Sequence, residues 1–365
     1  MHIFWKRPDS GLVHRGKMAG VLALALIMLM LAACGAQGGQ EAAAGSGQTQ
    51  ASVDAQNEDN GKTADSGSAE AAENNESAGA ADSSGTPAAE ASTRTVETVE
   101  GPIEIPSSPQ RLVADEYYAP LLALGVKPIG TPGLQMKNPY TKGLGGDVED
   151  IGDYGNPSME KVLSLQPDMI LTGNADNYEA YSKIAPTVVV PYGDLKNADE
   201  ELTYFGQLFG IEDKAAAWLE DYDKRIAEAK ARVDAAIPAD ASFSIIEDID
   251  KVPYAYGDNF GRGGQPVYQA LGRKPPEAVA DEIMKKQWME LSEELLPKYA
   301  GDYIVLTSNK RTLDDLKADP LWSTLDAVKN DRVYVWKEER SWYYDPLAVL
   351  SQTEELADWL VDSAK

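Results

Sequence analysis

The sequence predicts an α/β protein in which two lobes flank one long helix. Two observations carry this prediction. First, short apolar runs alternate with helical patterns in residues 95–210 and again after Pro238, an order typical of parallel sheets covered by helices. Second, residues 212–237 form one helical pattern without Gly or Pro. At about 1.5 Å per residue this helix is about 39 Å long, which is more than one small lobe needs.

The N-terminal lobe is predicted to start with a hairpin, because residues 96–106 alternate in polarity and end in a turn signal. Ser158 has the side chain of a helix N-cap, and Gly125 is a helix stop. Strands are then expected at 111–114, 128–130, 168–172 and 188–190, with helices at 120–125, 158–166 and 178–184.

In the long helix, apolar residues recur three or four positions apart: Trp218, Tyr222, Ile226, Ala229, Val233 and Ile237. After it, strands are expected at 243–247, 252–256, 303–307 and 332–336, with helices at 265–272, 292–299, 321–329 and 347–363. We therefore place the N-terminal lobe at 95–210, the interlobe helix at 211–238 and the C-terminal lobe at 239–365.

Cys34 stands at the end of an N-terminal leader. Basic residues precede an apolar run from Met18 to Ala33, and this order predicts a secretory signal peptide over 1–33. The run is shorter than the roughly 20 residues that cross a bilayer, which disfavours the alternative of a transmembrane anchor. The cysteine at the cleavage point resembles the lipobox of bacterial lipoproteins. It predicts a palmitate-type lipid anchor on the extracytoplasmic face of the cell membrane.

The segment 34–94 is dominated by Ala, Gly, Ser, Gln, Asn, Asp and Glu and contains no aromatic residue. Such a segment cannot bury enough apolar surface to offset its ordering entropy. We expect a disordered, acidic tether between the anchor and the lobes.

Composition excludes much catalytic chemistry. Cys34 is the only cysteine, and both histidines, His2 and His14, lie in the leader. The processed chain therefore has no side chain for Ser-His-Asp catalysis, a cysteine nucleophile, a disulfide or a His-ligated metal. The formal net charge of -26 argues against nucleic acid as a partner. We expect no catalytic residue, no cofactor and no metal held by the protein.

Six strings in order resemble one known family: 105–113 (IPSSPQRLV), 121–130, 151–170, 181–188, 322–334 and 345–350. From about residue 96 to the C-terminus, the chain resembles the iron–siderophore-binding lipoproteins of bacterial ABC importers, the class with a rigid interlobe helix. The resemblance implies two Rossmann-like lobes with a ligand cleft between them, because ligands bind beyond the carboxyl ends of strands in open α/β sheets. It implies a binding protein, not an enzyme, that delivers a ferric siderophore to permease subunits. We also expect a monomer.

The string 257–264 (GDNFGRGG) is the strongest candidate for a ligand contact. The family places an arginine here, after an aromatic residue and a glycine, on the oxygens of the chelate. Arg262 and Phe260 occupy those positions, and we expect Arg262 to be exposed in the cleft without core packing. A dinucleotide-binding motif is the alternative, but its third glycine is absent and Pro266 lies just past that place. The other alternative interpretation of this string is a tight glycine turn with an arginine exposed on the surface.

Further contacts are expected from aromatic residues and one more arginine. In 340–345 (RSWYYD), Trp342 and Tyr343 offer flat apolar surface and Arg340 offers donors. On the N-terminal lobe, Tyr140 and Tyr117 are the expected contacts. The siderophore itself coordinates the iron, so the protein supplies no iron ligands.

The charge of the cleft favours one class of siderophore. Asp115 and Glu116 follow the first strand of the lobe, where carboxylates would repel an anionic chelate. This predicts a hydroxamate siderophore, with a catecholate as the alternative. Two other functions stay open: a receptor for free ferric ion through tyrosines, and a surface hydrolase that uses this carboxylate pair. Neighbouring residues on a strand point to opposite faces, which disfavours the hydrolase.

Two glutamates match the family's positions for docking to the permease. The resemblance implies one acidic residue on each lobe, paired with arginines of the membrane subunits. Glu160 matches the first position, and Glu294 fits the second better than Glu293.

Overall fold

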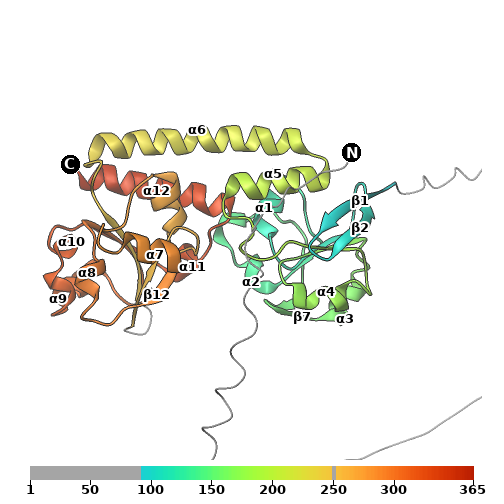
Figure 1. The fold of residues 1–365 in the computed structure, drawn as a ribbon, viewed down its shortest axis with the longest axis horizontal. Helices are drawn as coiled ribbons and strands as arrows, with labels where there is room; N and C mark the ends of the chain where they lie inside the picture. The colour runs from blue at the N-terminus through green and yellow to red at the C-terminus, as the bar shows by residue number, and fades with distance from the viewer. Residues whose placement is uncertain (1–91, 249–251) are drawn as a thin grey trace, which may run out of the picture. The chain divides into compact units, whose positions relative to one another are not determined.

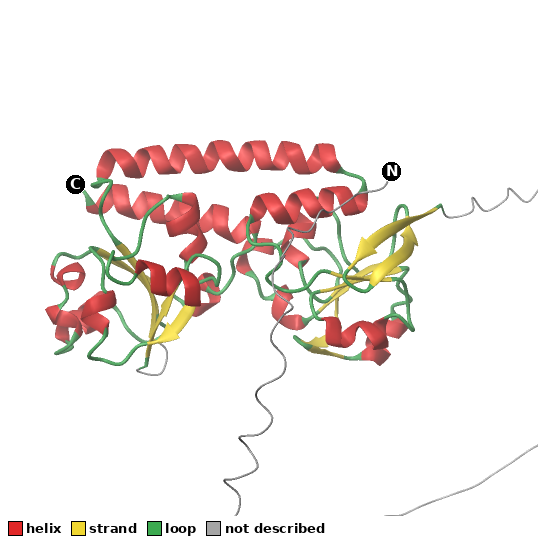
Figure 2. Ribbon diagram, in the orientation of Figure 1, coloured by secondary structure: helices red, strands yellow, loops and turns green. Residues whose placement is uncertain are grey.

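The computed structural model describes residues 92–248 and 252–365, which contain two five-stranded sheets and a set of helices (Figures 1 and 2). The leader, Cys34 and almost all of the expected tether lie outside the described residues. Within these two ranges, no helix combines the length and the apolar character that a membrane span requires.

The N-terminal lobe begins with the predicted hairpin. Strands β1 (Thr93–Thr98) and β2 (Gly101–Pro106) pair antiparallel, with Val96 opposite Ile103. Exposed and half-buried residues alternate along β1, as expected for a strand with one face on the protein. Strand β1 starts at Thr93, two residues before the predicted start of the lobe.

The N-terminal sheet is parallel throughout and has the order β5-β4-β3-β8-β9. Ser158 caps α3, since its hydroxyl accepts from the backbone N–H of Lys161, as predicted. The elements of this sheet and its surroundings are β3 (Leu112–Ala114), α1 (Tyr118–Ala123), β4 (Gly130–Thr131), α2 (Gly133–Met136), η1 (Pro139–Thr141), β5 (Glu149–Asp150), β6 (Gly152–Asp153), β7 (Asn156–Pro157), α3 (Met159–Ser164), β8 (Met169–Thr172), η2 (Ala175–Asn177), α4 (Tyr178–Tyr181) and β9 (Thr187–Val189).

The sequence analysis missed helix α5 (Ala198–Phe209), although both of its ends carry clear signals. The Asn197 side chain accepts from the backbone N–H of Glu200 at the start. Gly210 ends the helix with φ +64°. An Asn N-cap followed by a Gly C-cap is a recognised helix signature.

The long helix α6 (Glu212–Ala236) confirms the predicted one and is accompanied by α12 (Pro346–Ser363) along part of its length (Figure 1). Arg225 of α6 makes a bidentate ion pair with Glu354 of α12, at 2.8 and 2.7 Å. Arg232 pairs with Asp358 farther along. The connection between the lobes is therefore a pair of packed helices.

The C-terminal sheet is mixed, which corrects the expectation of a parallel sheet. Its order is β12-β11-β10-β13-β14; β10, β13 and β14 are parallel, whereas β11 runs antiparallel to both of its neighbours, β10 and β12. The reason is the short link from Asp248 to Pro253, because parallel neighbours need a crossover of about a dozen residues. The strands are β10 (Phe243–Asp248), β11 (Pro253–Tyr256), β12 (Trp288–Glu290), β13 (Tyr303–Thr307) and β14 (Val333–Trp336).

Short helices surround this sheet. The predicted helix at 321–329 is divided at Leu325, whose ψ of 135° is extended. The helices are η3 (Gln265–Ala270, a π-helix), α7 (Ala280–Lys286), α8 (Leu296–Tyr299), α9 (Leu313–Ala318), η4 (Trp322–Thr324), α10 (Asp326–Lys329) and α11 (Glu338–Ser341). Each sheet contributes to two apolar clusters, so both of its faces are covered. The α/β fold class is thus confirmed, and the exact limits of the lobes stay a prediction.

Candidate functional site

Arg262 has an unusual backbone conformation. Its φ is +57°, and the flanking Gly261 and Gly263 have φ of +72° and +98°. A Cβ on Gly261 would lie 2.6 Å from the carbonyl oxygen of Trp342, and one on Gly263 would lie 2.7 Å from the Trp336 ring. The backbone N–H of Arg262 donates to the Ser341 carbonyl at 2.7 Å. Such strain at a non-glycine residue is typical of functional sites.

The Arg262 side chain is buried and paired, which corrects the expectation of an exposed arginine. Arg262 as a whole is 7% exposed. Nε lies 2.8 Å from Oε1 of Glu247, the residue before the last of β10. The guanidinium also stacks 4.1 Å from the centre of the Trp342 ring. An uncompensated charge this deep would be costly, so the fold supplies a carboxylate.

Aromatic side chains continue outward from Arg262. The Phe260 ring is half-buried and lies 6.2 Å from that of Tyr256 and 6.4 Å from that of Trp288. Trp288 and Trp342 are 50% and 38% exposed. Sequence reasoning placed Phe260 and Trp342 here but missed Trp288, because strand β12 was not predicted. We call Glu247, Tyr256, Phe260, Arg262 and Trp342 the C-terminal wall.

On the N-terminal lobe, Glu116 faces polar partners near a pocket. Its carboxylate accepts from Gln135 Nε2 at 2.9 Å and from the Tyr154 hydroxyl. Burial is the largest influence and raises the pKa of Glu116 to about 7, although these hydrogen bonds lower it. We call Glu116, Gln135 and Tyr154 the N-terminal wall. A cavity of about 510 Å³ adjoins it, lined by Gly133, Leu134, Met136, Lys137, Asp150, Gly152, Asp153 and Tyr154.

Asp115 does not belong to this wall, which corrects the prediction of two carboxylates. It is 7% exposed and accepts from the hydroxyls of Thr172 and Tyr181 at 2.8 and 3.0 Å. Burial raises the pKa of Asp115 above its usual value. Asp115 and Glu116 therefore have separate sets of partners, and only Glu116 contacts Gln135 and Tyr154. The hydrolase alternative therefore loses its carboxylate pair.

Several residues that are predicted as ligand contacts join the two lobes. The Tyr140 hydroxyl donates to the Arg340 carbonyl at 3.1 Å, and the Tyr343 hydroxyl donates to the Leu134 carbonyl at 3.3 Å. The guanidinium of Arg340 lies 5.3 Å from the Tyr140 ring and pairs with Glu355. We call this region the interlobe junction.

Two contacts at the junction were not predicted. Asn138 Nδ2 donates to Asp345 Oδ2 at 2.8 Å, and each residue also caps its own helix. The Tyr192 ring meets that of Tyr344 edge-on at 6.4 Å. Asn138 and Asp345 are readable as N-caps, but sequence alone does not show that two caps bind each other.

Tyr117 lies in the core of the N-terminal lobe. It is 7% exposed, its hydroxyl donates to the Val190 carbonyl at 3.0 Å, and its ring lies 5.1 Å from Phe205. The structure therefore gives it a packing role and no open face toward a ligand.

The two glutamates that are predicted to dock on the permease are both exposed. Glu160 lies in the first turn of α3, and Glu294 lies in the turn before α8. In Figure 1, α3 and α8 belong to different lobes and both lie away from α6.

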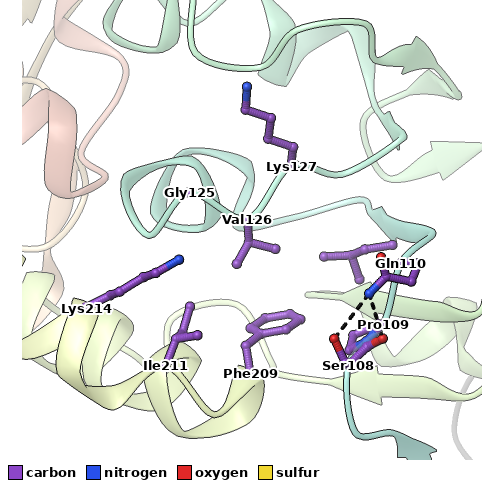
Figure 3. A pocket seen from close by; sticks show the side chains of 10 residues that line it. Ser108, Pro109, Gln110, Gly125, Val126, Lys127, Phe209, Ile211 and Lys214 are labelled. Carbon is purple, nitrogen blue, oxygen red and sulfur yellow. Dashed lines mark hydrogen bonds between the residues drawn. The ribbon is translucent and has the colours of Figure 1, made fainter. Parts of the chain in front are cut away.

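A second cavity, of about 250 Å³, lies on the N-terminal lobe between the end of α1 and the α5–α6 turn (Figure 3). Val126, Phe209 and Ile211 line it together with the Lys214 side chain. None of the predicted ligand contacts lines it. Across the residues that the structure describes, no three or more of His, Cys, Asp and Glu are grouped so that they could hold a metal ion.

Comparison with known proteins identifies the family. The family model for periplasmic binding proteins matches residues 113–340. The chain belongs to the periplasmic binding protein family. The members of this family bind substrates and do not transform them, so the prediction of a binding protein that is not an enzyme is confirmed.

Relatives of this periplasmic binding protein carry iron-related names. The iron(3+)-hydroxamate-binding protein YxeB of Bacillus subtilis is 38% identical over 279 residues, which are 74% of this chain and 86% of YxeB. The structure of the FhuD protein from S. pseudintermedius has a TM-score of 0.65 and 31% identity, and the match covers 74% of this chain and 98% of that one. FhuD2 from Staphylococcus aureus with bound ferrioxamine B has a TM-score of 0.63 and 32% identity, with 70% and 100% covered. The resemblance to siderophore-binding proteins of ABC importers is thus confirmed.

Proposed function

We propose that this protein captures a ferric hydroxamate siderophore and delivers it to the permease of an ABC importer. The observation that carries the proposal is the buried Arg262, which is held on Trp342 in a strained backbone conformation. The names of YxeB and of the ferrioxamine-bound FhuD2 support the hydroxamate class.

The C-terminal wall suits a preformed chelate. A ferric siderophore already fills the coordination sphere of its iron, so the receptor needs flat apolar surface and donors for the ligand oxygens. Phe260 and Trp342 offer the surface. Nε of Arg262 donates to Glu247, and the two Nη groups of Arg262 are proposed to donate to the chelate oxygens.

The junction and the N-terminal wall complete the proposed site. Tyr140, Arg340 and Tyr343 are proposed to form its floor, because they join the lobes. Tyr117 is proposed to support the N-terminal wall from the core. An acidic side chain, Glu116, on this wall disfavours a chelate with several negative charges.

The remaining parts serve delivery. We propose that Cys34 carries the lipid anchor, that 34–94 tethers a monomeric receptor at the extracytoplasmic face of the membrane, and that the lobes span 95–210 and 239–365. Glu160 and Glu294 are proposed to dock the two lobes on the permease subunits, since both are exposed and each lies on a different lobe.

The test is a tryptophan-fluorescence titration of the whole protein with ferric hydroxamates, ferric catecholates and ferric ion. We expect saturable quenching by hydroxamates. Saturable binding of ferric ion that a strong chelator abolishes would instead support the receptor for free iron, and binding of catecholates alone would replace the substrate class.

A further inference from the structure

The ion pair between Glu247 and Arg262 is almost completely withdrawn from water. The two side chains are 6% and 9% exposed, and Nε of Arg262 lies 2.8 Å from Oε1 of Glu247. The other carboxylate oxygen, Oε2, accepts from the hydroxyl of Tyr256. Burial and this bond raise the pKa of Tyr256 above its usual value, so the phenol keeps its proton and acts as the donor. Glu247 thus has both oxygens engaged inside the protein.

This arrangement fixes the orientation of the guanidinium. Its Nε edge faces Glu247, its face lies on Trp342, and its backbone is held by the bond from Arg262 N–H to Ser341. The Nη groups are the remaining donors. Glu247 therefore acts on a ligand through Arg262, as a positioning residue.

The same arrangement also cancels a charge. Arginine is always protonated in proteins, so an unpaired Arg262 would offer a full positive charge to any ligand beside it. With Glu247 at 2.8 Å the pair is neutral overall, yet its Nη groups still donate hydrogen bonds. Glu116, on the opposite wall, adds no positive charge.

The charge of ferric chelates differs by class. Three hydroxamate anions neutralise ferric ion, whereas three catecholate dianions leave the complex with three negative charges. A neutral pair that still donates hydrogen bonds suits the uncharged trihydroxamate complex. It attracts the trianionic tricatecholate complex only weakly, because it has no net charge.

We propose that Glu247 sets the charge selectivity of this site, by neutralising Arg262 so that uncharged chelates are accepted and polyanionic ones are disfavoured. The inference rests on the proposed function and adds the residue that decides between the two siderophore classes.

The test compares two ligands on the wild type and on Glu247→Gln. The probes are an uncharged hexadentate ferric trihydroxamate and a hexadentate ferric tricatecholate. The Gln carbonyl still accepts from Arg262 Nε, so hydroxamate affinity is expected to fall by no more than about threefold. The affinity for the tricatecholate is expected to rise, so that the ratio of the two dissociation constants shifts by at least about tenfold toward catecholate. The catecholate gain should shrink at high salt.

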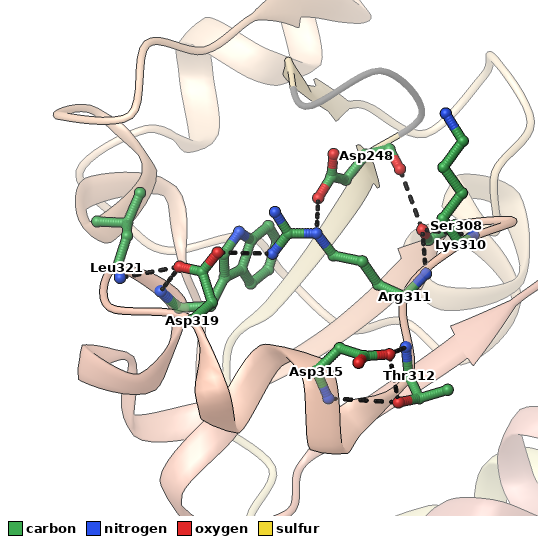
Figure 4. Close-up of polar contacts among 9 residues, drawn as sticks. Asp248, Ser308, Lys310, Arg311, Thr312, Asp315, Asp319 and Leu321 are labelled. Atoms are coloured by element: carbon green, nitrogen blue, oxygen red, sulfur yellow. Dashed lines mark hydrogen bonds and ion pairs between the residues drawn. The ribbon is translucent and has the colours of Figure 1, made fainter.

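Asp248→Asn is the matched control. Asp248 is the next residue of β10, is 4% exposed and binds Arg311 Nε at 2.9 Å (Figure 4). It belongs to a different group of contacts, because Arg311 also pairs with Asp319 at 3.0 Å. Like Glu247→Gln, the control removes the charge of a buried β10 carboxylate that is paired with an arginine, but it leaves Arg262 and its partners unchanged. The ratio of the two dissociation constants should therefore match that of the wild type.

The outcomes separate the inference from the proposed function. Failure of the wild type to bind any ferric hydroxamate would overturn the function itself. Hydroxamate binding by the wild type with an unchanged ratio in Glu247→Gln would overturn only the role of Glu247, as would an equal shift in Asp248→Asn. If Glu247→Gln does not fold, Arg262→Gln tests the same claim. This variant leaves the negative charge of Glu247 without its positive partner, so the ratio of the two dissociation constants must shift further toward hydroxamate.

Discussion

Arg262 in the C-terminal wall is buried and Glu116 in the N-terminal wall is half-buried, and only Arg262 has a partner of opposite charge. Glu247 holds Arg262 at 2.8 Å, whereas Glu116 is held by the neutral groups of Gln135 and Tyr154. The C-terminal wall thus keeps its charges fixed. The N-terminal wall contains a carboxyl group whose raised pKa lets it titrate near neutral pH.

The difference in charge pairing indicates that the two walls have different roles in binding. A charge that is paired and stacked in one orientation can recognise a rigid chelate without reorganisation. A carboxyl group bound only by neutral donors can change its charge with pH at little structural cost. We infer that the C-terminal wall supplies most of the affinity and that the N-terminal wall modulates it.

The largest expected effect lies outside both walls. Replacing both glutamates that are proposed to dock on the permease, Glu160→Ala with Glu294→Ala, is expected to reduce siderophore uptake at least about tenfold, because the proposed interface would lose a charge on each lobe. Ligand affinity in a fluorescence titration should not change.

The control for docking is Glu149→Ala with Glu277→Ala, which removes one other exposed glutamate from each lobe. It should leave uptake normal in a radioactive-iron transport assay. Normal uptake by the docking variant as well would show that these glutamates do not form the permease interface.

The C-terminal wall is also expected to tolerate little change in its backbone. Gly263→Ala puts a Cβ 2.7 Å from the Trp336 ring at a φ of +98°, so the free energy of unfolding is expected to fall by about 2–4 kcal/mol. Chemical denaturation measures this.

Gly143 of the N-terminal lobe is the comparison for that variant. Its φ is +84°, but no atom lies within 4 Å of an added Cβ. Gly143→Ala should therefore cost only about 1 kcal/mol. Equal losses for the two variants would mean that the close packing around Arg262 contributes nothing beyond the backbone strain.

Arg262→Ala is expected to weaken ferric hydroxamate binding by about ten- to a hundredfold, the equivalent of a charge-assisted hydrogen bond of about 1.5–3 kcal/mol. Arg262→Lys should not restore it fully, because a point charge cannot bind Glu247 and donate from a planar fork. Fluorescence titration measures both variants. Wild-type affinity in Arg262→Ala would remove Arg262 from the site, and wild-type affinity in Arg262→Lys would show that a point charge at this position is enough.

The last expected effect concerns Glu116 and the pH dependence of stability. Its pKa in the folded protein, about 7, lies above the usual 4.5, so the native state binds this proton more tightly than the unfolded state. Its contribution to stability is therefore fully present below about pH 4.5 and is lost as the pH rises through about 7. Glu116→Gln should abolish this loss, which is about 2–3 kcal/mol between pH 5 and pH 8.

The measurement is denaturant unfolding of both proteins at pH 5 and pH 8. The difference between variant and wild type is the quantity of interest, since other buried carboxyl groups, such as Asp115, titrate in both. A difference that does not depend on pH would place the titration of Glu116 outside this range.

Local signals in the sequence predicted several features that the structure contains. The family resemblance marked Arg262 in the Gly-Arg-Gly string, and the structure shows positive φ at all three of these residues. The Ser158 cap and the uninterrupted pattern of α6 were equally readable. These features depend on residues close together in the chain.

Features that depend on distant residues were not predictable. Glu247 precedes Arg262 by 15 positions and reaches it only through the antiparallel placement of β10 and β11. Trp288 joins Phe260 because β12 is the edge strand of that sheet. The burial of Arg262 follows from these long-range contacts, which no local spacing encodes.

The most direct test of the proposed role of Arg262 is a crystal structure of this protein with a bound ferric hydroxamate. We expect the chelate to lie against the Trp342 ring, with its oxygens within hydrogen-bonding distance of the Arg262 Nη atoms and with the bond from Nε to Glu247 kept. A chelate bound without contact to Arg262, or seated in the cavity between α1 and the α5–α6 turn, would contradict it.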